Sequence, residues 1–248
     1  MNNLLTISHI SKNYNTKEGE IQAIKDINFE IKKGEIISLV GPSGCGKSTL
    51  LSIISDLDKD YSGIITKNND LKIAYMLQSD ALLPFLTIYE NAILGLKITK
   101  QINSQNLEYV NYLLKLYNLE EFKNNYPKSL SGGMKQRLAL IRTLALKPDL
   151  LLLDEPFCAL DSQSRLLISN DVYKIVKEKK ITIILVTHNI EEAITFSDKV
   201  IVLSKRPSEI KNIININIQN NTSIYERRKD QRFNEYFDLI WKDLDIDE

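Results

Sequence analysis

One short stretch of the chain has the residue types and spacing that hold a nucleotide phosphate. Residues 41–48 read Gly-Pro-Ser-Gly-Cys-Gly-Lys-Ser and directly follow the apolar run 36–40. Glycines let backbone N–H groups converge on phosphate oxygens, and a helix that starts after the loop adds its positive end. We expect Lys47 to reach the β- and γ-phosphates, Ser48 to bind Mg²⁺ and Thr49 to contact the α-phosphate. The residues predicted to bind nucleotide here are Gly41, Pro42, Ser43, Gly44, Cys45, Gly46, Lys47, Ser48 and Thr49. The alternative is a glycine-rich turn without a ligand.

Two adjacent carboxylates form a second candidate for chemistry. Asp154 and Glu155 follow four leucines, residues 150–153. Ligands of parallel α/β sheets bind at the carboxyl ends of the strands, where these side chains are expected. Asp154 is therefore predicted to hold Mg²⁺, and Glu155 to orient and deprotonate a water that attacks the γ-phosphate. An Asp-Glu pair can also simply cap a loop.

A second candidate anion site lies in the middle of the chain. Ser131, Gly132 and Gly133 open a predicted helix, with Ser131 as its N-cap. The two glycines allow a phosphate to approach the exposed N–H groups. Because the first loop already binds a nucleotide, one chain with two half-sites suggests two chains that share two nucleotides. A capped helix with a flexible entry is the alternative.

The apolar pattern indicates the elements that must position these groups. Residues 36–40, 150–153 and 181–186 are short apolar runs typical of buried strands. Residues 162–180 carry apolar positions on one helical face. Strand, helix and strand in this order predict a parallel α/β unit.

Two further regions have a different pattern. Residues 4–10 and 27–31 alternate enough to suggest a small antiparallel sheet with one solvated face. Residues 91–147 have helical spacing, which ends before Pro148, and are interpreted as a helical insertion.

The C-terminal segment changes character. Residues 205–232 carry seven Lys and Arg against three Asp and Glu. Residues 233–248 carry one Lys against six Asp and Glu, with apolar positions at helical spacing. An amphipathic helix is therefore predicted near the end. It either packs back on the body of the protein or serves as a regulatory or partner-binding tail.

Composition excludes several classes of protein. The chain has 248 residues, with 32 Lys and Arg against 32 Asp and Glu. This balance argues against nucleic-acid binding by bulk charge, so no nucleic-acid partner is expected. No apolar run approaches the roughly 20 residues of a membrane helix, and two cysteines form no disulfide framework. We expect Cys45 to be a small loop residue, with a thiol open to activation by Lys47 and the helix start. Cys158 is expected to serve packing.

The ordered motifs together resemble those of the ATP-binding-cassette (ABC) ATPases, over about residues 2–206. The matching pieces are Tyr14 as the aromatic that stacks on adenine, 41–48 as Walker A, Gln78 as the Q-loop glutamine, 130–136 as the signature, 150–155 as Walker B, 159–161 as the D-loop, and His188 as the switch histidine. The resemblance implies an α/β fold of the P-loop NTPase class, with a RecA-like parallel core, an antiparallel β subdomain and a helical subdomain at about 91–147. Residues 207–248 are then a C-terminal tail.

The resemblance also implies roles for single residues. Gln78 is expected to touch Mg²⁺ or the attacking water, and His188 the γ-phosphate, which makes them catalytic with Glu155. The predicted metal ligands are Ser48, Gln78 and Asp154. Gln136 joins Ser131, Gly132 and Gly133 as a nucleotide contact, supplied by a second copy of the chain. After His188, residues 189–192 indicate an N-cap with a capping box. The cofactors implied are ATP and Mg²⁺.

Finer matches point to one branch of the family. A lone cassette without membrane segments resembles the separate ATPase subunit of an importer. Residues 78–91, 154–161 and 202–207 look like those of nitrate, sulfonate and taurine importers, and thiamin-precursor importers share them. The implied partners are integral membrane permease subunits, a solute-binding protein indirectly, and a second copy of the chain. The implied location is the cytoplasmic face of the membrane. The alternative is a soluble ABC-type clamp or assembly factor without a permease.

Overall fold

The structure is a computed structural model that describes residues 3–17, 19–68, 70–218 and 223–244. The strands are β1 (Asn3–Thr16), β2 (Gly19–Lys32), β3 (Ile36–Val40), β4 (Ser62–Lys67), β5 (Ile73–Met76), β6 (Leu150–Asp154), β7 (Thr182–Val186), β8 (Lys199–Leu203) and β9 (Ile210–Asn215). The helices are α1 (Lys47–Ile54), α2 (Ile88–Ala92), α3 (Leu94–Ile98), α4 (Ser104–Leu116), α5 (Gly132–Leu144), α6 (Ser162–Lys179), α7 (Ile190–Phe196), α8 (Ile224–Arg228) and α9 (Phe233–Asp243), with 3₁₀ turns at Glu120–Phe122 and Pro127–Ser129.

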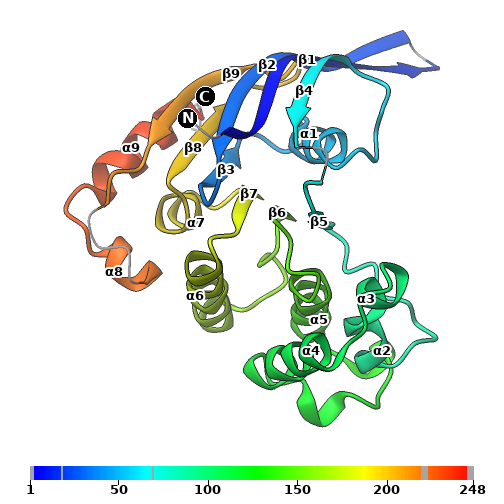
Figure 1. The fold of residues 1–248 in the computed structure, drawn as a ribbon. Helices are drawn as coiled ribbons and strands as arrows, with labels where there is room; N and C mark the ends of the chain where they lie inside the picture. Colours follow the sequence, from blue (N-terminus) through cyan, green and yellow to red (C-terminus); the bar gives the residue numbers. More distant parts are fainter. Residues whose placement is uncertain (1–2, 18, 69, 219–222, 245–248) are drawn as a thin grey trace.

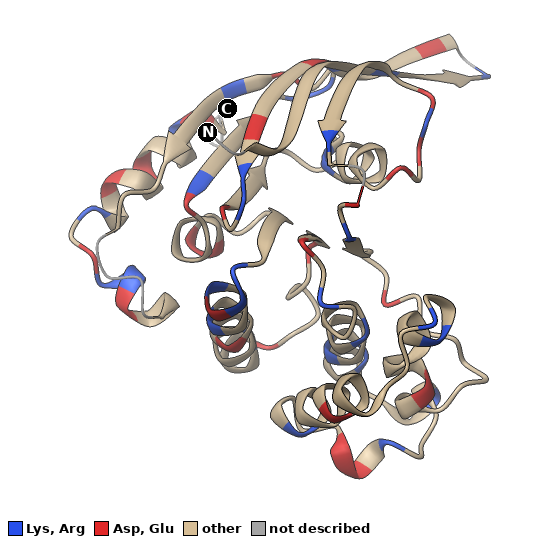
Figure 2. Ribbon diagram, in the orientation of Figure 1, with Lys and Arg blue, Asp and Glu red and all other residues tan. Residues whose placement is uncertain are grey.

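The central sheet has the order β5-β6-β7-β3-β8-β9 (Figure 1). All neighbouring pairs are parallel except β8 and β9. Every residue of β3, β6 and β7 is buried, because helices and a second sheet cover both faces. Charged residues lie mostly on helices and loops (Figure 2), and Asp154 at the end of β6 is the one charged residue of these three strands. The predicted α/β class with a parallel core is confirmed.

Adjacent residues of the central strands belong to different cores. Leu150 and Leu152 pack with α1 and the antiparallel sheet β2-β1-β4. Leu151 and Leu153 pack with α5, α6 and the helical insertion. The period-2 alternation of a strand thus joins the two halves of the molecule through one sheet.

Helices α2 to α5 lie in the stretch predicted to be a helical insertion. The first of them begins at Ile88, because Thr87 caps it with a full capping box that includes Glu90. Val110, Leu113 and Leu114 of α4 are buried, as their helical spacing requires. Arg142 of α5 donates hydrogen bonds to the carbonyls of Asp80 and Ala81, which ties this helix to the segment after Gln78.

The C-terminal segment lies against the body of the protein. Strand β9 pairs with β8, and Phe233 and Ile240 of α9 are buried in a core with α7. The amphipathic pattern therefore corresponds to a helix with one buried face. The division at residue 206 stays a prediction, and the ends of the proposed units, residues 2 and 248, lie outside the described residues.

Candidate ATP-binding and hydrolysis site

An open cavity of about 580 Å³ brings the main sequence candidates together. It is lined by Tyr14 from β1, by the loop before α1 with the start of that helix, by Gln78 after β5 and by Glu155 after β6. The loop before α1, Gln78 and Glu155 each follow a parallel strand of the central sheet, so the carboxyl ends of these strands place them at one edge, while Tyr14 comes from the antiparallel sheet. Because the predicted nucleotide-binding and catalytic groups meet in this cavity, it is the candidate nucleotide site.

The loop before α1 has the backbone form that a phosphate cradle needs. Gly44 and Gly46 have φ angles of 72° and 118°, a region that side chains with a Cβ rarely adopt. Gly46 precedes α1 without a side-chain cap, so the helix start presents its N–H groups openly. Lys47 is buried and its ammonium donates to the carbonyls of Gly41 and Pro42, at 2.8 and 2.9 Å. Cys45 is buried, which closes its thiol to solvent reagents.

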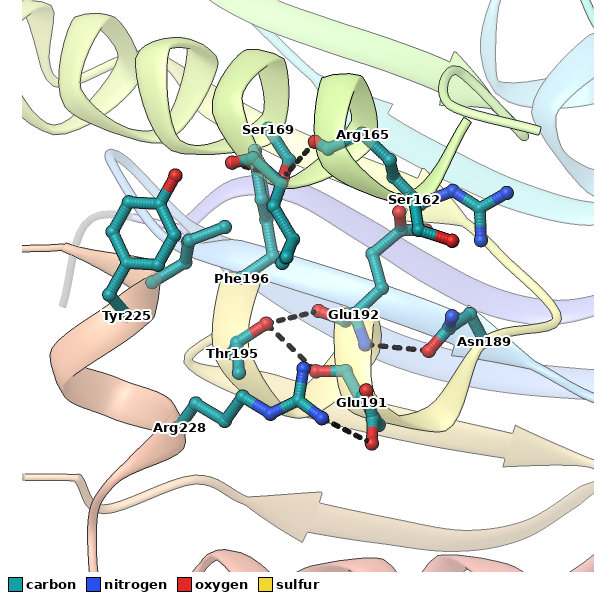
Figure 3. A pocket seen from close by; sticks show the side chains of 12 residues that line it. Ser162, Arg165, Ser169, Asn189, Glu191, Glu192, Thr195, Phe196, Tyr225 and Arg228 are labelled. Carbon is teal, nitrogen blue, oxygen red and sulfur yellow. Dashed lines mark hydrogen bonds and ion pairs between the residues drawn. The ribbon is translucent and has the colours of Figure 1, made fainter. Parts of the chain in front are cut away.

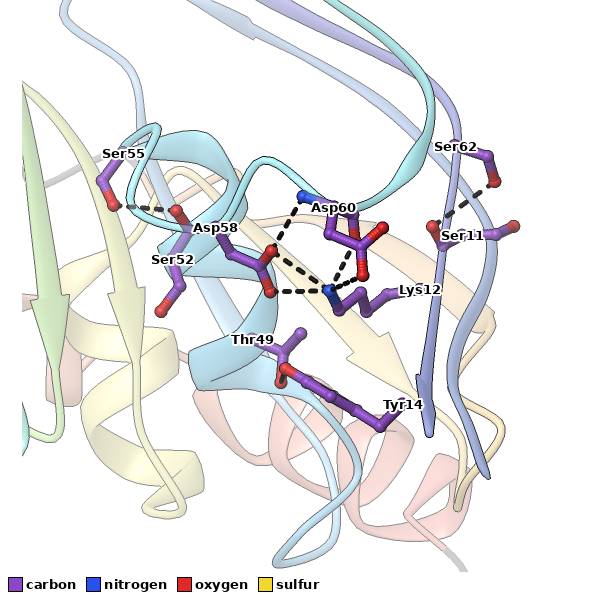
Figure 4. A network of polar contacts seen from close by, with 9 residues as sticks. All are labelled: Ser11, Lys12, Tyr14, Thr49, Ser52, Ser55, Asp58, Asp60 and Ser62. Atoms are coloured by element: carbon purple, nitrogen blue, oxygen red, sulfur yellow. Dashed lines mark hydrogen bonds and ion pairs between the residues drawn. The ribbon is translucent and has the colours of Figure 1, made fainter. Parts of the chain in front are cut away.

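Tyr14 lines this cavity and is 41% exposed. Its hydroxyl donates to the Thr49 hydroxyl at 3.3 Å, and the Lys12 ammonium lies 4.9 Å from the ring centroid (Figure 4). Lys12 is held by Asp58 and Asp60. The ring is therefore fixed in place beside the phosphate loop, with exposed surface for a planar base.

Asp154 sits below the loop and is 2% exposed. Burial raises the pKa of its carboxyl, while hydrogen bonds from Ser48 and Tyr75 oppose that rise. The Tyr75 hydroxyl donates to Oδ2 at 3.3 Å, and Oδ1 is buried without a hydrogen-bond partner in the described chain. A buried Asp154 carboxylate oxygen without a partner, beside the Ser48 hydroxyl, offers the oxygen ligands that Mg²⁺ prefers. The residues present therefore fit the predicted ion.

Glu155 is the meeting point of the three predicted catalytic side chains. Its Oε2 lies 3.4 Å from Gln78 Nε2, which donates, and 3.5 Å from His188 Nδ1. Glu155 has a φ of 49°, so the chain turns sharply after β6 and carries this carboxylate to the cavity. Contacts of this length are common before a substrate tightens a site.

The predicted signature residues do not line this cavity. Ser131 caps α5, and its hydroxyl accepts from Met134 N–H, as predicted. A Cβ on Gly132 would meet no described atom within 4 Å beyond its own helix turn, whereas one on Gly133 would lie 3.1 Å from Leu160. Gln136 is buried; its amide donates to the Glu155 carbonyl at 3.0 Å and accepts from Ala159 N–H at 2.9 Å. These bonds fix the turn after β6, and contact of Gln136 with nucleotide stays a prediction.

Two sequence interpretations need correction. Asn189 does cap α7 by accepting from Glu192 N–H, but its own N–H donates to the Thr187 hydroxyl. The Glu192 carboxyl therefore does not complete the predicted capping box. Cys158, expected to serve packing, is exposed, because the turn after β6 carries it out of the core.

Sequence reasoning missed three side chains near the site. Arg206 lines the nucleotide cavity. Arg165 and Glu192 lie beside Glu155 and His188, where they line a small hollow between α6 and α7. Figure 3 shows the Glu192 side chain extending from α7 toward α6. In the sequence, Arg165 is one of several polar residues of a predicted helix, and Glu192 is a carboxylate four residues after His188. Neither position indicates chemistry by itself.

Comparison with known proteins agrees with this geometry. Residues 24–158 match the family described as ABC transporter, which is more than half of the chain. The chain therefore belongs to the ABC transporter ATP-binding family, and it is an ABC-type ATPase. This confirms the resemblance drawn from the ordered motifs.

Particular relatives support the same family. The chain is 41% identical to the uncharacterized ABC transporter ATP-binding protein YtlC of Bacillus subtilis, over 97% of this chain and 95% of that one. It is 37% identical to the aliphatic sulfonates import ATP-binding protein SsuB of Bacillus thuringiensis, over 92% and 91%. The dimeric post-hydrolysis structure of the ATP-binding cassette MJ0796 bound to ADP and Pi matches with a TM-score of 0.77 and 35% identity, covering 86% of this chain and 98% of that one. No described helix is long and apolar enough to span a bilayer.

Proposed function

We propose that the chain is the ATP-hydrolysing subunit of an importer that takes up a small solute through separate permease subunits. The observation that carries the proposal is the convergence of Tyr14, the 41–48 loop, Gln78 and Glu155 on one cavity. Relatives named as import ATP-binding proteins support the importer branch. Solutes of the nitrate, sulfonate and taurine type, or a thiamin precursor, fit the sequence features of that branch. The proposed location is the cytoplasmic face of the membrane, with a solute-binding protein as an indirect partner.

The hydrolytic role falls to Glu155 in this proposal. Its carboxylate orients and deprotonates the water that attacks the γ-phosphate. The Gln78 amide and the His188 ring contact that carboxylate, and the His188 ring also contacts the γ-phosphate. Lys47 exchanges its loop carbonyls for phosphate oxygens when ATP binds. Ser48, Gln78 and Asp154 would hold Mg²⁺, which supplies charge neutralisation at the phosphates.

A second copy completes the site. Ser131 and Gly132 are exposed in this chain, away from its own cavity. The N–H groups at the start of α5 would reach the nucleotide of the partner copy. The dimeric structures of MJ0796 support this arrangement. ATP then closes the pair and hydrolysis reopens it.

The segment Gln78–Tyr89 is the proposed contact for a permease. Phe85 is 71% exposed, so this segment offers an apolar side chain to a partner. Asn91 is buried and binds the backbone of Leu83, Leu86 and Thr87, which holds this surface in a fixed shape. A permease helix that binds here would move when Gln78 changes position with the bound nucleotide.

The test replaces the proposed base. Glu155→Gln should bind ATP within about threefold of the parent, while hydrolysis falls at least about 100-fold, the usual contribution of a general base. ATP affinity is measured by calorimetry and turnover by phosphate release. Lys47→Ala is the companion variant and should lose affinity itself. Hydrolysis by Glu155→Gln at the parental rate would overturn the assignment.

The importer assignment has its own test. The parental protein, expressed in its host, should sediment with membranes and be released by a mild chaotrope. If it hydrolyses ATP but stays entirely in the soluble fraction, the alternative of a soluble clamp without a permease is correct.

A further inference from the structure

We propose that Arg206 is an additional nucleotide-binding residue, which binds the polyphosphate of ATP and ADP from the loop between β8 and β9. The inference rests on the proposed ATP site and adds a cation to it. In the sequence this arginine serves only as a mark of one branch of the family.

The position of Arg206 is the first argument. Its side chain lines the same cavity as Tyr14 and Ser43. One terminal N–H group of the guanidinium donates to the Gly44 carbonyl at 2.6 Å. Arg206 thus lies directly on the loop whose glycines form the phosphate cradle, although 162 residues separate the two in sequence.

The loop that carries Arg206 is anchored on both sides. Ser208 N–H donates to the Ala23 carbonyl at 3.0 Å, and Lys25 N–H donates to the Ser208 carbonyl at 2.9 Å, so this loop forms a bridge with β2. Ser204 binds Glu209 at the base of the loop through backbone and hydroxyl. A side chain that starts from so fixed a backbone is already placed for a ligand, which lowers the entropy lost on binding.

The guanidinium of Arg206 has N–H donors left for a ligand. A guanidinium carries five N–H donors in a planar fork that matches phosphate oxygens. Arg206 is exposed, its one hydrogen bond goes to Gly44, and no carboxylate pairs with it in the described ranges. Lys47, the other cation of this cavity, is buried against the loop. Arg206 is therefore the cation that can meet a polyphosphate from the solvent side of the cradle.

The test compares two neighbouring cations. Arg206→Ala and Arg206→Lys are made in the Glu155→Gln background, so that ATP is not consumed. Lys205→Ala is the matched control, since Lys205 is an exposed cation of the same loop that does not line the cavity. Calorimetric titrations use ATP, ADP and adenosine with each variant. Urea unfolding midpoints verify that the fold is unchanged.

Arg206→Ala should weaken ATP and ADP binding roughly 10-fold, the usual effect of losing hydrogen bonds to a charged group. Adenosine affinity should stay the same, and Arg206→Lys should recover only part of the loss because lysine lacks the planar fork. Lys205→Ala should bind like the parent.

Unchanged ATP affinity in Arg206→Ala would overturn the inference, and so would an equal loss for adenosine, which places the residue on the nucleoside. The proposed function fails separately: in that case the parental protein neither binds nor hydrolyses ATP. A parent that hydrolyses ATP with an indifferent Arg206 removes only this residue from the site.

Discussion

At the scale of single residues, the carboxyl group of Glu192 lies in a demanding electrostatic environment. Burial raises its pKa above the ordinary 4.5, and the negative charge of Glu155 adds to that rise, while a hydrogen bond from Thr187 and the positive charges of Arg165 and His188 oppose it. Arg228 from α8 lines a second pocket, which Glu192 and Arg165 also line. Ionisation of Glu192 therefore lowers the free energy of unfolding. The residue lies beside the side chains proposed to hydrolyse ATP.

The sign of the pH effect follows from the raised pKa. Below pH 4.5 Glu192 is protonated in both the folded and the unfolded chain and costs nothing. As pH rises above 4.5, the unfolded chain ionises first, so the free energy of unfolding falls until the folded pKa is passed. Glu192→Gln removes this loss, so the variant should match the parent near pH 4.5 and be more stable at pH 7.5.

Urea unfolding at the two pH values checks this expectation. The control is Glu191→Gln, since Glu191 forms an exposed ion pair with Arg228 and should change stability by less than about 1 kcal/mol at both pH values. An equal difference between Glu192→Gln and the parent at both pH values would contradict the assigned cause.

At the scale of elements, helix α8 packs the C-terminal segment against the helix that follows His188. It contacts α6, which follows the turn at residues 159–161, and α7, which follows His188. Arg227 is 1% exposed, lies over the Tyr173 ring and donates to the carbonyls of Ile194 and Ser197 at the end of α7. The tail therefore completes the packing of two helices that begin at the proposed site.

Adjacent arginines in α8 give a matched comparison. Arg227→Ala leaves the carbonyls of Ile194 and Ser197 buried without their donor and should cost about 2–4 kcal/mol. Arg228→Ala removes only the exposed pair with Glu191 and should cost less than about 1 kcal/mol. Urea unfolding measures both, and equal effects of the two variants would contradict the role given to Arg227.

At the scale of the whole molecule, the described residues of one chain give no steric reason for a glycine at position 132. A Cβ there would meet none of their atoms within 4 Å beyond its own helix turn, and alanine is favoured over glycine in helices by up to about 1 kcal/mol. A nucleotide held by a second copy would need this space, because a phosphate approaches the N–H groups at the start of α5 closely.

Gly132→Ala should therefore keep or slightly raise the stability of the monomer while it lowers ATPase turnover at least about tenfold. In the Glu155→Gln background, size-exclusion chromatography with ATP should show a dimer that the added Gly132→Ala change weakens. Lys115→Ala on the exposed side of α4 is the control and should dimerise like the parent. If the Gly132→Ala protein dimerises and hydrolyses ATP normally, the shared-site proposal is wrong.

Short stretches of the sequence were enough to predict several elements of the fold, and the roles given to the motif residues stay predictions. Local rules were sufficient there: glycines before Lys47 dictate a phosphate loop, apolar runs dictate the buried strands β3, β6 and β7, and Ser131 caps the helix it precedes. The family could also be predicted, because each motif is a short stretch and the order of the motifs can be read directly from the chain.

Only the tertiary structure decided which side chains meet. Arg206 reaches Gly44 because β8 lies beside β3, and Arg227 is buried because α8 docks on α7. The capping box failed because Thr187, fixed by the end of β7, takes the Asn189 N–H. Such contacts join residues that are distant in sequence or compete for one partner, and burial and strand order set them. A pattern of residue types along a chain predicts which strands are buried, but it gives neither the order of the strands nor the outcome of a competition for one partner.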